Sequence, residues 1–192
     1  MTTGDRTMRD PFFFGYGSLV NRATHVYAPA HRARLRGWRR AWRHTGHRDG
    51  PFLTAIPCPE SEIEGLIAAV PGADWAALDA RESGYDRLAL GTGLTVEAVT
   101  GIETQIYSVP DHSVTDGDGP ILLSYLDVVL QGYLLEFGPT GVRRFMETTD
   151  GWQTPVLDDR AAPRYPRHQR LSAEEIAMVD AELARLGVAV QR

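Results

Sequence analysis

Residues 11–19 read Pro-Phe-Phe-Phe-Gly-Tyr-Gly-Ser-Leu, an aromatic run that ends in a turn with two glycines. The aromatic residues predict a short β-strand over 11–15, and the glycines predict a tight turn after it. Such a loop ahead of a helix start can point consecutive backbone N–H groups at an anion. The simpler alternative is a turn that uses glycine only for its backbone freedom. A phosphate P-loop is excluded, because its spacing differs and the chain has no lysine.

A second stretch that could carry out chemistry is Leu78–Asp86, which reads Leu-Asp-Ala-Arg-Glu-Ser-Gly-Tyr-Asp. Glu82 stands at the end of a predicted helix and beside a glycine, from where its carboxylate can project into a cavity. Burial would raise the pKa of Glu82 from about 4.3 toward neutrality, where a carboxyl group both takes and gives a proton. The alternative is a solvated glutamate at a helix end, paired with Arg81 or Arg87.

Together the two stretches resemble the motifs of the gamma-glutamylcyclotransferase superfamily, which includes a ChaC-type branch that degrades glutathione. The motifs are Tyr-Gly-Ser-Leu at 16–19 and Arg-Glu-Ser-Gly-Tyr at 81–85, in that order. Residues 36–40 and 63–67 are similar to strand motifs of the same family, and the resemblance covers roughly residues 11–137. It implies a small mixed β-barrel with flanking helices.

The resemblance also implies a reaction, in which a γ-glutamyl compound cyclises to 5-oxoproline and releases an amine, an amino acid or a dipeptide. Glu82 would be the general acid/base, and the substrate would be held by Tyr16, Gly17, Ser18, Leu19, Tyr85 and Tyr125. No metal or other cofactor is implied. The alternative is a member of the same fold that binds a ligand or a partner without catalysis. The identity of the released amine stays open.

Composition is consistent with one cytoplasmic domain. The 192 residues are 43% hydrophobic, carry a net charge of −5 and include a single cysteine, Cys58. The acidic balance gives no argument for binding nucleic acid or an anionic membrane. The apolar stretch at 121–135 is interrupted by Ser124, Asp127 and Gln131 and is unsuited to span a bilayer. The oligomeric state is not indicated.

The order of elements predicts the α+β class. Strands are expected at 33–43, 52–56, 62–70, 88–100 and 104–109, and helices at 22–27, 74–81, 121–137 and 172–186. Residues 1–10 are expected to form a flexible leader, and 11–192 a single domain in which 138–192 is an appended irregular segment ending in a helix. The arginines of the 33–43 strand are expected to form a solvated face, with Arg39 or Arg40 available to pair with an acidic group of the substrate.

Overall fold

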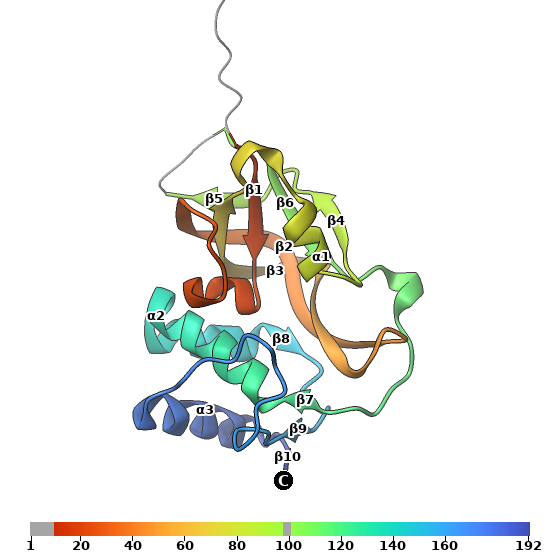
Figure 1. Ribbon diagram of the computed structural model, residues 1–192, viewed down its shortest axis with the longest axis vertical. Coiled ribbons are helices and arrows are strands. Elements are labelled where there is room, and N and C mark those ends of the chain that lie inside the picture. The colour runs from red at the N-terminus through yellow and green to blue at the C-terminus, as the bar shows by residue number, and fades with distance from the viewer. Residues whose placement is uncertain (1–9, 98–100) are drawn as a thin grey trace, which may run out of the picture.

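The computed structural model describes residues 10–97 and 101–192, so the expected leader and the end of the 88–100 strand lie largely outside the described residues. The α+β class is confirmed: a seven-stranded mixed sheet packs above a lower layer that contains the two longer helices (Figure 1). The strands of the large sheet are β1 (Phe12–Gly15), β2 (Ala30–Thr45), β3 (Arg48–Ala69), β4 (Asp86–Ala89), β5 (Leu94–Val96), β6 (Thr104–Ser108) and β8 (Thr149–Asp150).

Strand β1 lies in the middle of the large sheet, whose order is β4-β6-β1-β3-β2-β5, with β8 beside β2. It runs antiparallel to β3 and parallel to β6, so that Phe14 is opposite both Ile67 and Ile106. All three of these side chains are buried, which explains why an aromatic run of only four residues forms a strand. Within the described residues the edge strands β4 and β5 do not pair, and the expected closed barrel is therefore an open sheet.

Strands β2 and β3 form one long hairpin, where three separate strands were expected. The two expected strands at 52–56 and 62–70 belong to β3, and its pairing with β2 is interrupted between Pro57, opposite Trp38, and Glu62, opposite Arg36. The register shifts between Arg36 and Trp38, around Gly37, which has a positive φ of 82°. The extra residues of this irregularity, 58–61, lie in β3. Leu35 is buried before it, and Arg40 and Trp42 are buried after it, so the expected solvated arginine face is wrong at Arg40.

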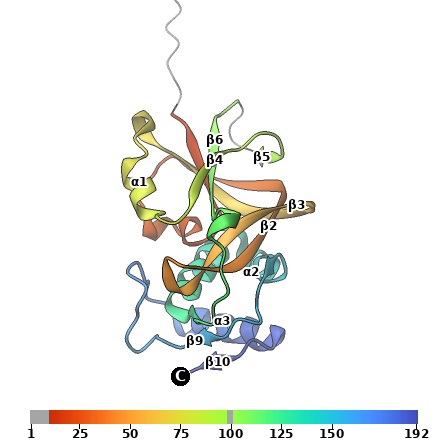
Figure 2. The same ribbon diagram turned by 90° about the vertical axis from the view of Figure 1, so that its right-hand side faces the viewer.

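The lower layer is built from α2 (Leu123–Glu147) and α3 (Ala173–Leu186), with a small sheet of β7 (Ile121–Leu122), β9 (Val156–Leu157) and β10 (Val190–Gln191) (Figure 2). Helix α2 was expected to end at Gly138. The helix does break there, because Gly138 has φ 67° and ψ −173°, but Pro139 starts a second helical segment that continues to Glu147. Proline suits a first helical position, where its missing N–H is not needed. The 138–192 boundary thus falls inside a helix.

Helix α3 begins and ends as its sequence predicts. The Ser172 hydroxyl accepts from the Glu175 amide while the Glu175 carboxylate accepts from the Ser172 amide, and Gly187 ends the helix in the left-handed conformation. Among the described residues, no helix has both the length and the apolar character needed to cross a membrane.

Candidate active site

The loop that follows β1 is compact because two glycines permit close approaches. A Cβ on Gly15 would lie 2.6 Å from the Cβ of Leu19, and one on Gly17 would lie 2.7 Å from the hydroxyl of Tyr125. After the loop, a single 3₁₀ turn runs over Ser18–Val20, and its first backbone hydrogen bond goes from the Val20 amide to the Gly17 carbonyl. The amides of Ser18 and Leu19 precede that bond and, as at any helix start, have no acceptor within the turn itself.

Arg40 holds the loop in place from inside the protein. Its side chain is almost completely buried, with 1% of its surface exposed. The guanidinium donates to the carbonyl oxygens of Tyr16 (3.2 Å) and Glu64 (2.9 Å) and to the hydroxyls of Tyr133 (2.9 Å) and Thr148 (2.7 Å). Every one of these partners belongs to the protein, so Arg40 supports the loop and is not free to pair with a substrate. Arg39 is engaged with Asp150 at the surface.

The other end of the loop is attached to α2 and to a neutral histidine. Asn21 donates through Nδ2 to the Val128 carbonyl of α2 at 3.0 Å. Burial lowers the pKa of His25 to about 4, so its ring is neutral at pH 7. The Nε2 atom of His25 lies 3.1 Å from the Leu19 carbonyl, which fits a donated hydrogen bond from a neutral ring. Both ends of the loop are therefore fixed by non-local contacts.

Glu82 is placed by the short helix α1 (Ala76–Arg81), which it terminates. Leu78 of that helix and Leu19 of the loop belong to one buried apolar cluster, so the helix packs directly against the loop region. Gly84, with φ 96°, turns the chain back into β4. In the folded protein 17% of the Glu82 side-chain surface is exposed to solvent. Burial raises the pKa of the Glu82 carboxyl above its ordinary value, and the positive charges of Arg81, Arg167 and Arg48 reduce that rise.

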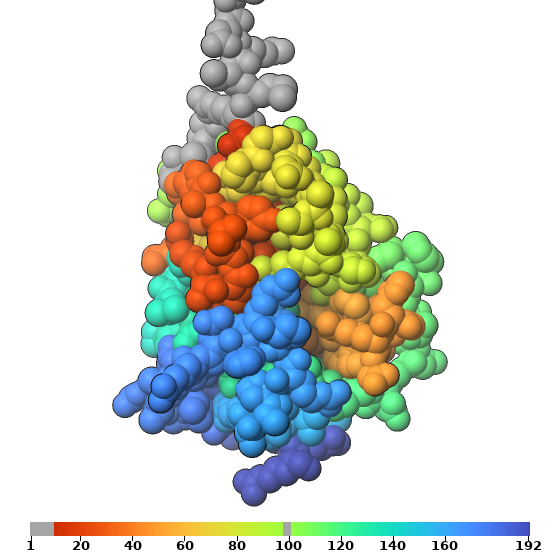
Figure 3. Space-filling view, viewed as in Figure 1, coloured from red at the N-terminus to blue at the C-terminus, as the bar shows by residue number. Residues whose placement is uncertain are grey.

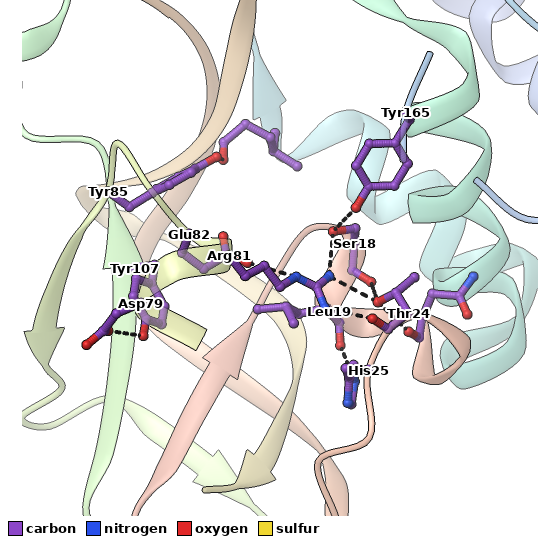
Figure 4. A network of polar contacts seen from close by, with 12 residues as sticks. Ser18, Leu19, Thr24, His25, Asp79, Arg81, Glu82, Tyr85, Tyr107 and Tyr165 are labelled. Atoms are coloured by element: carbon purple, nitrogen blue, oxygen red, sulfur yellow. Dashed lines mark hydrogen bonds and ion pairs between the residues drawn. The ribbon is translucent and has the colours of Figure 1, made fainter. Parts of the chain in front are cut away.

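Arg81 connects Glu82 to the loop (Figure 4). Its guanidinium lies 3.1 Å from the Glu82 carboxylate and donates to the Ser18 hydroxyl at 3.2 Å. It also donates to the carbonyl (2.8 Å) and hydroxyl (3.1 Å) of Thr24. With 8% of its side chain exposed, Arg81 is a buried bridge between the carboxylate and the turn. The sequence had indicated Arg81 only as a surface partner of Glu82.

A single cavity of about 30 Å³ brings the loop and Glu82 together. All seven residues expected at the site line it, and four others complete the lining. The expected residues are Tyr16, Gly17, Ser18, Leu19, Glu82, Tyr85 and Tyr125, and the additional ones are Phe14, Gly15, Leu53 and Tyr107. Tyr107 reaches the cavity because β6 pairs in parallel with β1, a long-range pairing that local sequence does not encode.

Tyrosine side chains form much of the cavity wall, and all of them are neutral phenols at pH 7. Burial raises the pKa of Tyr16, Tyr85, Tyr107 and Tyr125. Tyr85 donates its hydroxyl to the Leu53 carbonyl at 2.9 Å, and Tyr16 donates to the Tyr107 carbonyl at 2.5 Å. These side chains offer hydroxyl groups for orientation and do not supply negative charge near Glu82. In the described part of the chain, no cluster of three or more His, Cys, Asp or Glu side chains is placed to hold a metal ion.

Substituting Gly17→Ala tests the contact between the loop and α2. The added methyl group would meet the Tyr125 hydroxyl at 2.7 Å and would displace one wall of the cavity. If the cavity binds a ligand, we expect the affinity for that ligand to fall at least about tenfold. The reason is that the side chains that position the ligand would move by up to about an ångström. Gly46→Ala is the matched control, since a Cβ there meets nothing within 4 Å. Unchanged ligand binding in the Gly17 variant would contradict the role of this contact.

The amino-acid sequence of this chain matches that of a known protein family. A model of the family described as "Gamma-glutamyl cyclotransferase, AIG2-like" matches residues 13–125. The chain belongs to that family. The matched region starts in β1 and ends at Tyr125, so it contains the loop, Glu82 and Tyr85. No curated protein matches the chain by sequence.

Comparison with solved structures shows that this chain has the gamma-glutamyl cyclotransferase fold. One described as "Gamma-glutamyl cyclotransferase" superposes with a TM-score of 0.58 at 14% identity, over 90% of this chain and 99% of the other. The human protein loc79017 gives 0.57 at 15% identity over the same shares, and YkqA of Bacillus subtilis gives 0.56 at 17% identity over 74% of this chain and 56% of its own. At these identities the likeness establishes the fold alone.

The C-terminal segment beyond the family match also reaches the Ser18 loop. Tyr165 donates its hydroxyl to the Ser18 hydroxyl at 2.9 Å and packs edge-to-face on Tyr125, with the ring centres 5.0 Å apart. In Figure 3 this blue segment lies between the N-terminal residues, α1 and the orange end of the β2–β3 hairpin. The sequence indicated only an appended irregular segment here, and nothing in its local pattern identified Tyr165.

Proposed function

We propose that the protein is a gamma-glutamylcyclotransferase that converts a γ-glutamyl compound into 5-oxoproline and a free amine. The observation that carries the proposal is that Glu82, with a raised pKa, lines the same cavity as the Tyr16–Leu19 loop. The membership of the chain in the gamma-glutamyl cyclotransferase, AIG2-like family supports it. A cytoplasmic location accompanies this proposal as a prediction.

The reaction would need no nucleophile from the protein. The α-amino nitrogen of the substrate attacks its own γ-carbonyl carbon, the new C–N bond closes a five-membered lactam, and the old C–N bond to the amine breaks. Glu82 would take a proton from the attacking nitrogen and deliver it to the departing nitrogen, so atoms and charges balance without water. Positioned acid/base catalysis of this kind contributes about 10²–10⁴ in rate.

The loop would bend the substrate toward reaction. The amides of Ser18 and Leu19 are available to the substrate carboxylate or to the developing oxyanion, and the tyrosine hydroxyls can orient the chain. Holding the amine and the carbonyl in a near-attack geometry removes much of the entropic barrier. The loop would thus bind and bend the substrate, the tyrosines would orient it, and Glu82 would transfer the proton.

The alternative is a ligand-binding protein of the same fold without turnover, and a substrate panel separates the two. We expect the purified protein to release 5-oxoproline from at least one of glutathione, γ-glutamyl amino acids and γ-glutamyl amines, with added chelator leaving the rate unchanged. The measurement is 5-oxoproline by liquid chromatography. A panel without any 5-oxoproline, from protein that still binds a γ-glutamyl compound in calorimetry, would favour the binding protein.

The Arg81→Met variant should change how the rate depends on pH. Among the positive charges that lower the pKa of Glu82, Arg81 has the largest effect, so its removal leaves the burial effect less opposed and raises that pKa further. The carboxylate form is needed as the base, and the acid limb of the kcat/KM profile should therefore move to higher pH.

Arg87→Met is the control for this shift, because Arg87 pairs with Asp79 and is not among the charges that act on Glu82. Both profiles are measured on protein shown by circular dichroism to be folded across the pH range. If the acid limb of the profile stays in place in the Arg81 variant, Arg81 does not influence the pKa of Glu82.

A further inference from the structure

A larger second cavity adjoins the Glu82 cavity. Its volume is about 380 Å³, within the range of small-molecule sites. Tyr125 lines both cavities, and Tyr165, packed edge-on against it, lines the larger one. The second cavity is lined by Trp42, Arg48, Asp49, Gly50, Pro51, Pro120, Ile121, Leu122, Tyr125, Arg164 and Tyr165.

The walls of this cavity are mainly apolar and come from separate parts of the chain. Trp42 of β2 packs edge-to-face against Tyr125, with 6.0 Å between ring centres, and Pro51 and Pro120 belong to the hairpin and to the segment before α2. Trp42 is buried, and its indole N–H has no acceptor in the described part of the chain. A cavity with aromatic and proline walls favours an apolar group of similar size.

Two arginines and one aspartate supply the charge. Arg48 is oriented by its own hairpin, since it donates to the Pro51 carbonyl at 2.6 Å and stacks 3.7 Å from the centre of the Phe52 ring. Among residues 10–97 and 101–192, neither Arg48 nor Arg164 has a carboxylate within ion-pair distance, and Asp49 is the acidic residue of the lining. The net positive charge suits a ligand that carries a carboxylate next to an apolar group.

The backbone at Arg164, whose side chain is exposed, is held at the start of α2. Asp159 is buried and accepts hydrogen bonds from the Ser124 amide (2.7 Å), the Ser124 hydroxyl (2.6 Å) and the Arg164 amide (2.8 Å). Burial alone would raise the pKa of Asp159, but these hydrogen bonds outweigh it and lower the pKa, so the carboxylate is charged and firmly held. The C-terminal wall of the cavity is thus attached to the helix that carries Tyr125.

Resting on the proposed function, we propose that this second cavity is the subsite for the amine part of the substrate. It would select γ-glutamyl conjugates of α-amino acids with large apolar side chains. The glutamyl part would occupy the Glu82 cavity, the scissile amide would pass Tyr125, the apolar side chain would meet Trp42 and Pro51, and the α-carboxylate would meet Arg164. The amino acid leaves as the free amine when the lactam closes.

Three matched substrates separate the two features of the subsite. γ-Glutamylphenylalanine has both the ring and the carboxylate, γ-glutamylphenethylamine lacks the carboxylate, and γ-glutamylalanine lacks the ring. We expect kcat/KM to be at least about tenfold higher for γ-glutamylphenylalanine than for either of the other two substrates. A tenfold ratio corresponds to the free energy of one charge-assisted hydrogen bond or of one buried ring. Calorimetric binding of the three compounds is measured on the same protein, so that recognition is scored independently of turnover.

Arg164→Ala assigns the carboxylate contact. Its KM for γ-glutamylphenylalanine should rise about tenfold, while kinetics with γ-glutamylphenethylamine stay within a few-fold. Arg170→Ala is the control, an exposed arginine of the same segment that is outside the cavity lining. It should leave all three substrates unaffected.

The outcomes distinguish the subsite from the proposed reaction. Turnover without preference for the ring and carboxylate, or with no effect of Arg164→Ala, would overturn the subsite and leave the reaction intact. Binding of γ-glutamylphenylalanine that Arg164→Ala weakens, without 5-oxoproline from any compound, would overturn the reaction and support the subsite. Neither turnover nor binding would overturn both.

Discussion

Replacing Glu82 by glutamine is expected to lower kcat by at least about 10², with γ-glutamyl ligands still bound. Glutamine keeps the size of glutamate and much of its hydrogen bonding, including a contact with Arg81, but it cannot carry the proton from the attacking to the departing nitrogen. No other side chain of the cavity is suited to replace it, because its tyrosines are neutral phenols whose pKa values burial raises. The measurement is steady-state release of 5-oxoproline together with calorimetric binding.

The same variant has an expected effect on stability, in the opposite direction. Because the pKa of Glu82 is raised in the folded protein, the charged carboxylate costs stability as pH rises through and above its unfolded pKa. Glu82→Gln should therefore melt at the same or a higher temperature than the parent at pH 7, and the difference should shrink at a pH where both side chains are neutral. Glu103→Gln, at an exposed position, is the control. Near-normal turnover in a folded Glu82→Gln protein would refute the mechanism.

Arg40→Met is expected to be the most destabilising substitution near the site. The change removes a buried guanidinium that donates to two carbonyls and two hydroxyls, and leaves those groups short of a donor. The Tyr133 hydroxyl lies within hydrogen-bond distance of the carbonyls of Tyr16 (2.9 Å) and Glu64 (2.7 Å) and can donate its one proton to either, which limits the loss. Since each buried polar group without a partner costs about 1–3 kcal/mol, we expect the free energy of unfolding to fall by about 2–4 kcal/mol.

Urea unfolding measures this loss as a lower midpoint at an unchanged slope. The neighbouring Arg39→Met is the control, because Arg39 forms a partly exposed pair with Asp150 and such pairs contribute about 0–1 kcal/mol. The Arg40 variant should also lose at least about tenfold in kcat/KM, since the Tyr16 carbonyl loses its charged donor and is held less firmly. Equal stability of the two arginine variants would mean that Arg40 does not support the loop.

Features that depend only on consecutive residues were predictable from the sequence. The capping box at Ser172 and the glycine after Leu186 define α3 through contacts within one turn. The two motifs at 16–19 and 81–85 carried the family resemblance, and Glu82 and Tyr85 of the second meet the first in one cavity. The roles assigned to those residues are still predictions, because geometry alone does not measure proton transfer.

Features that depend on distant pairing were not predictable. The burial of Arg40 depends on partners far along the chain, the carbonyl of Glu64 and the hydroxyls of Tyr133 and Thr148. Tyr165 reaches Ser18 across a separation of 147 residues, and a tyrosine in a proline-containing segment gives no local sign of that contact.

The hydrogen bond from Tyr165 to Ser18 also has a consequence for protein synthesis. The loop and Glu82 are made early, but the residue that closes over the Ser18 hydroxyl is translated 147 residues after it. A nascent chain that has emerged only as far as α2 holds the proposed acid/base group and the glutamyl-binding turn without the wall that Tyr165 and Arg164 provide. We therefore expect the order of translation to delay substrate selection until the C-terminal segment has docked, well after the sheet can form.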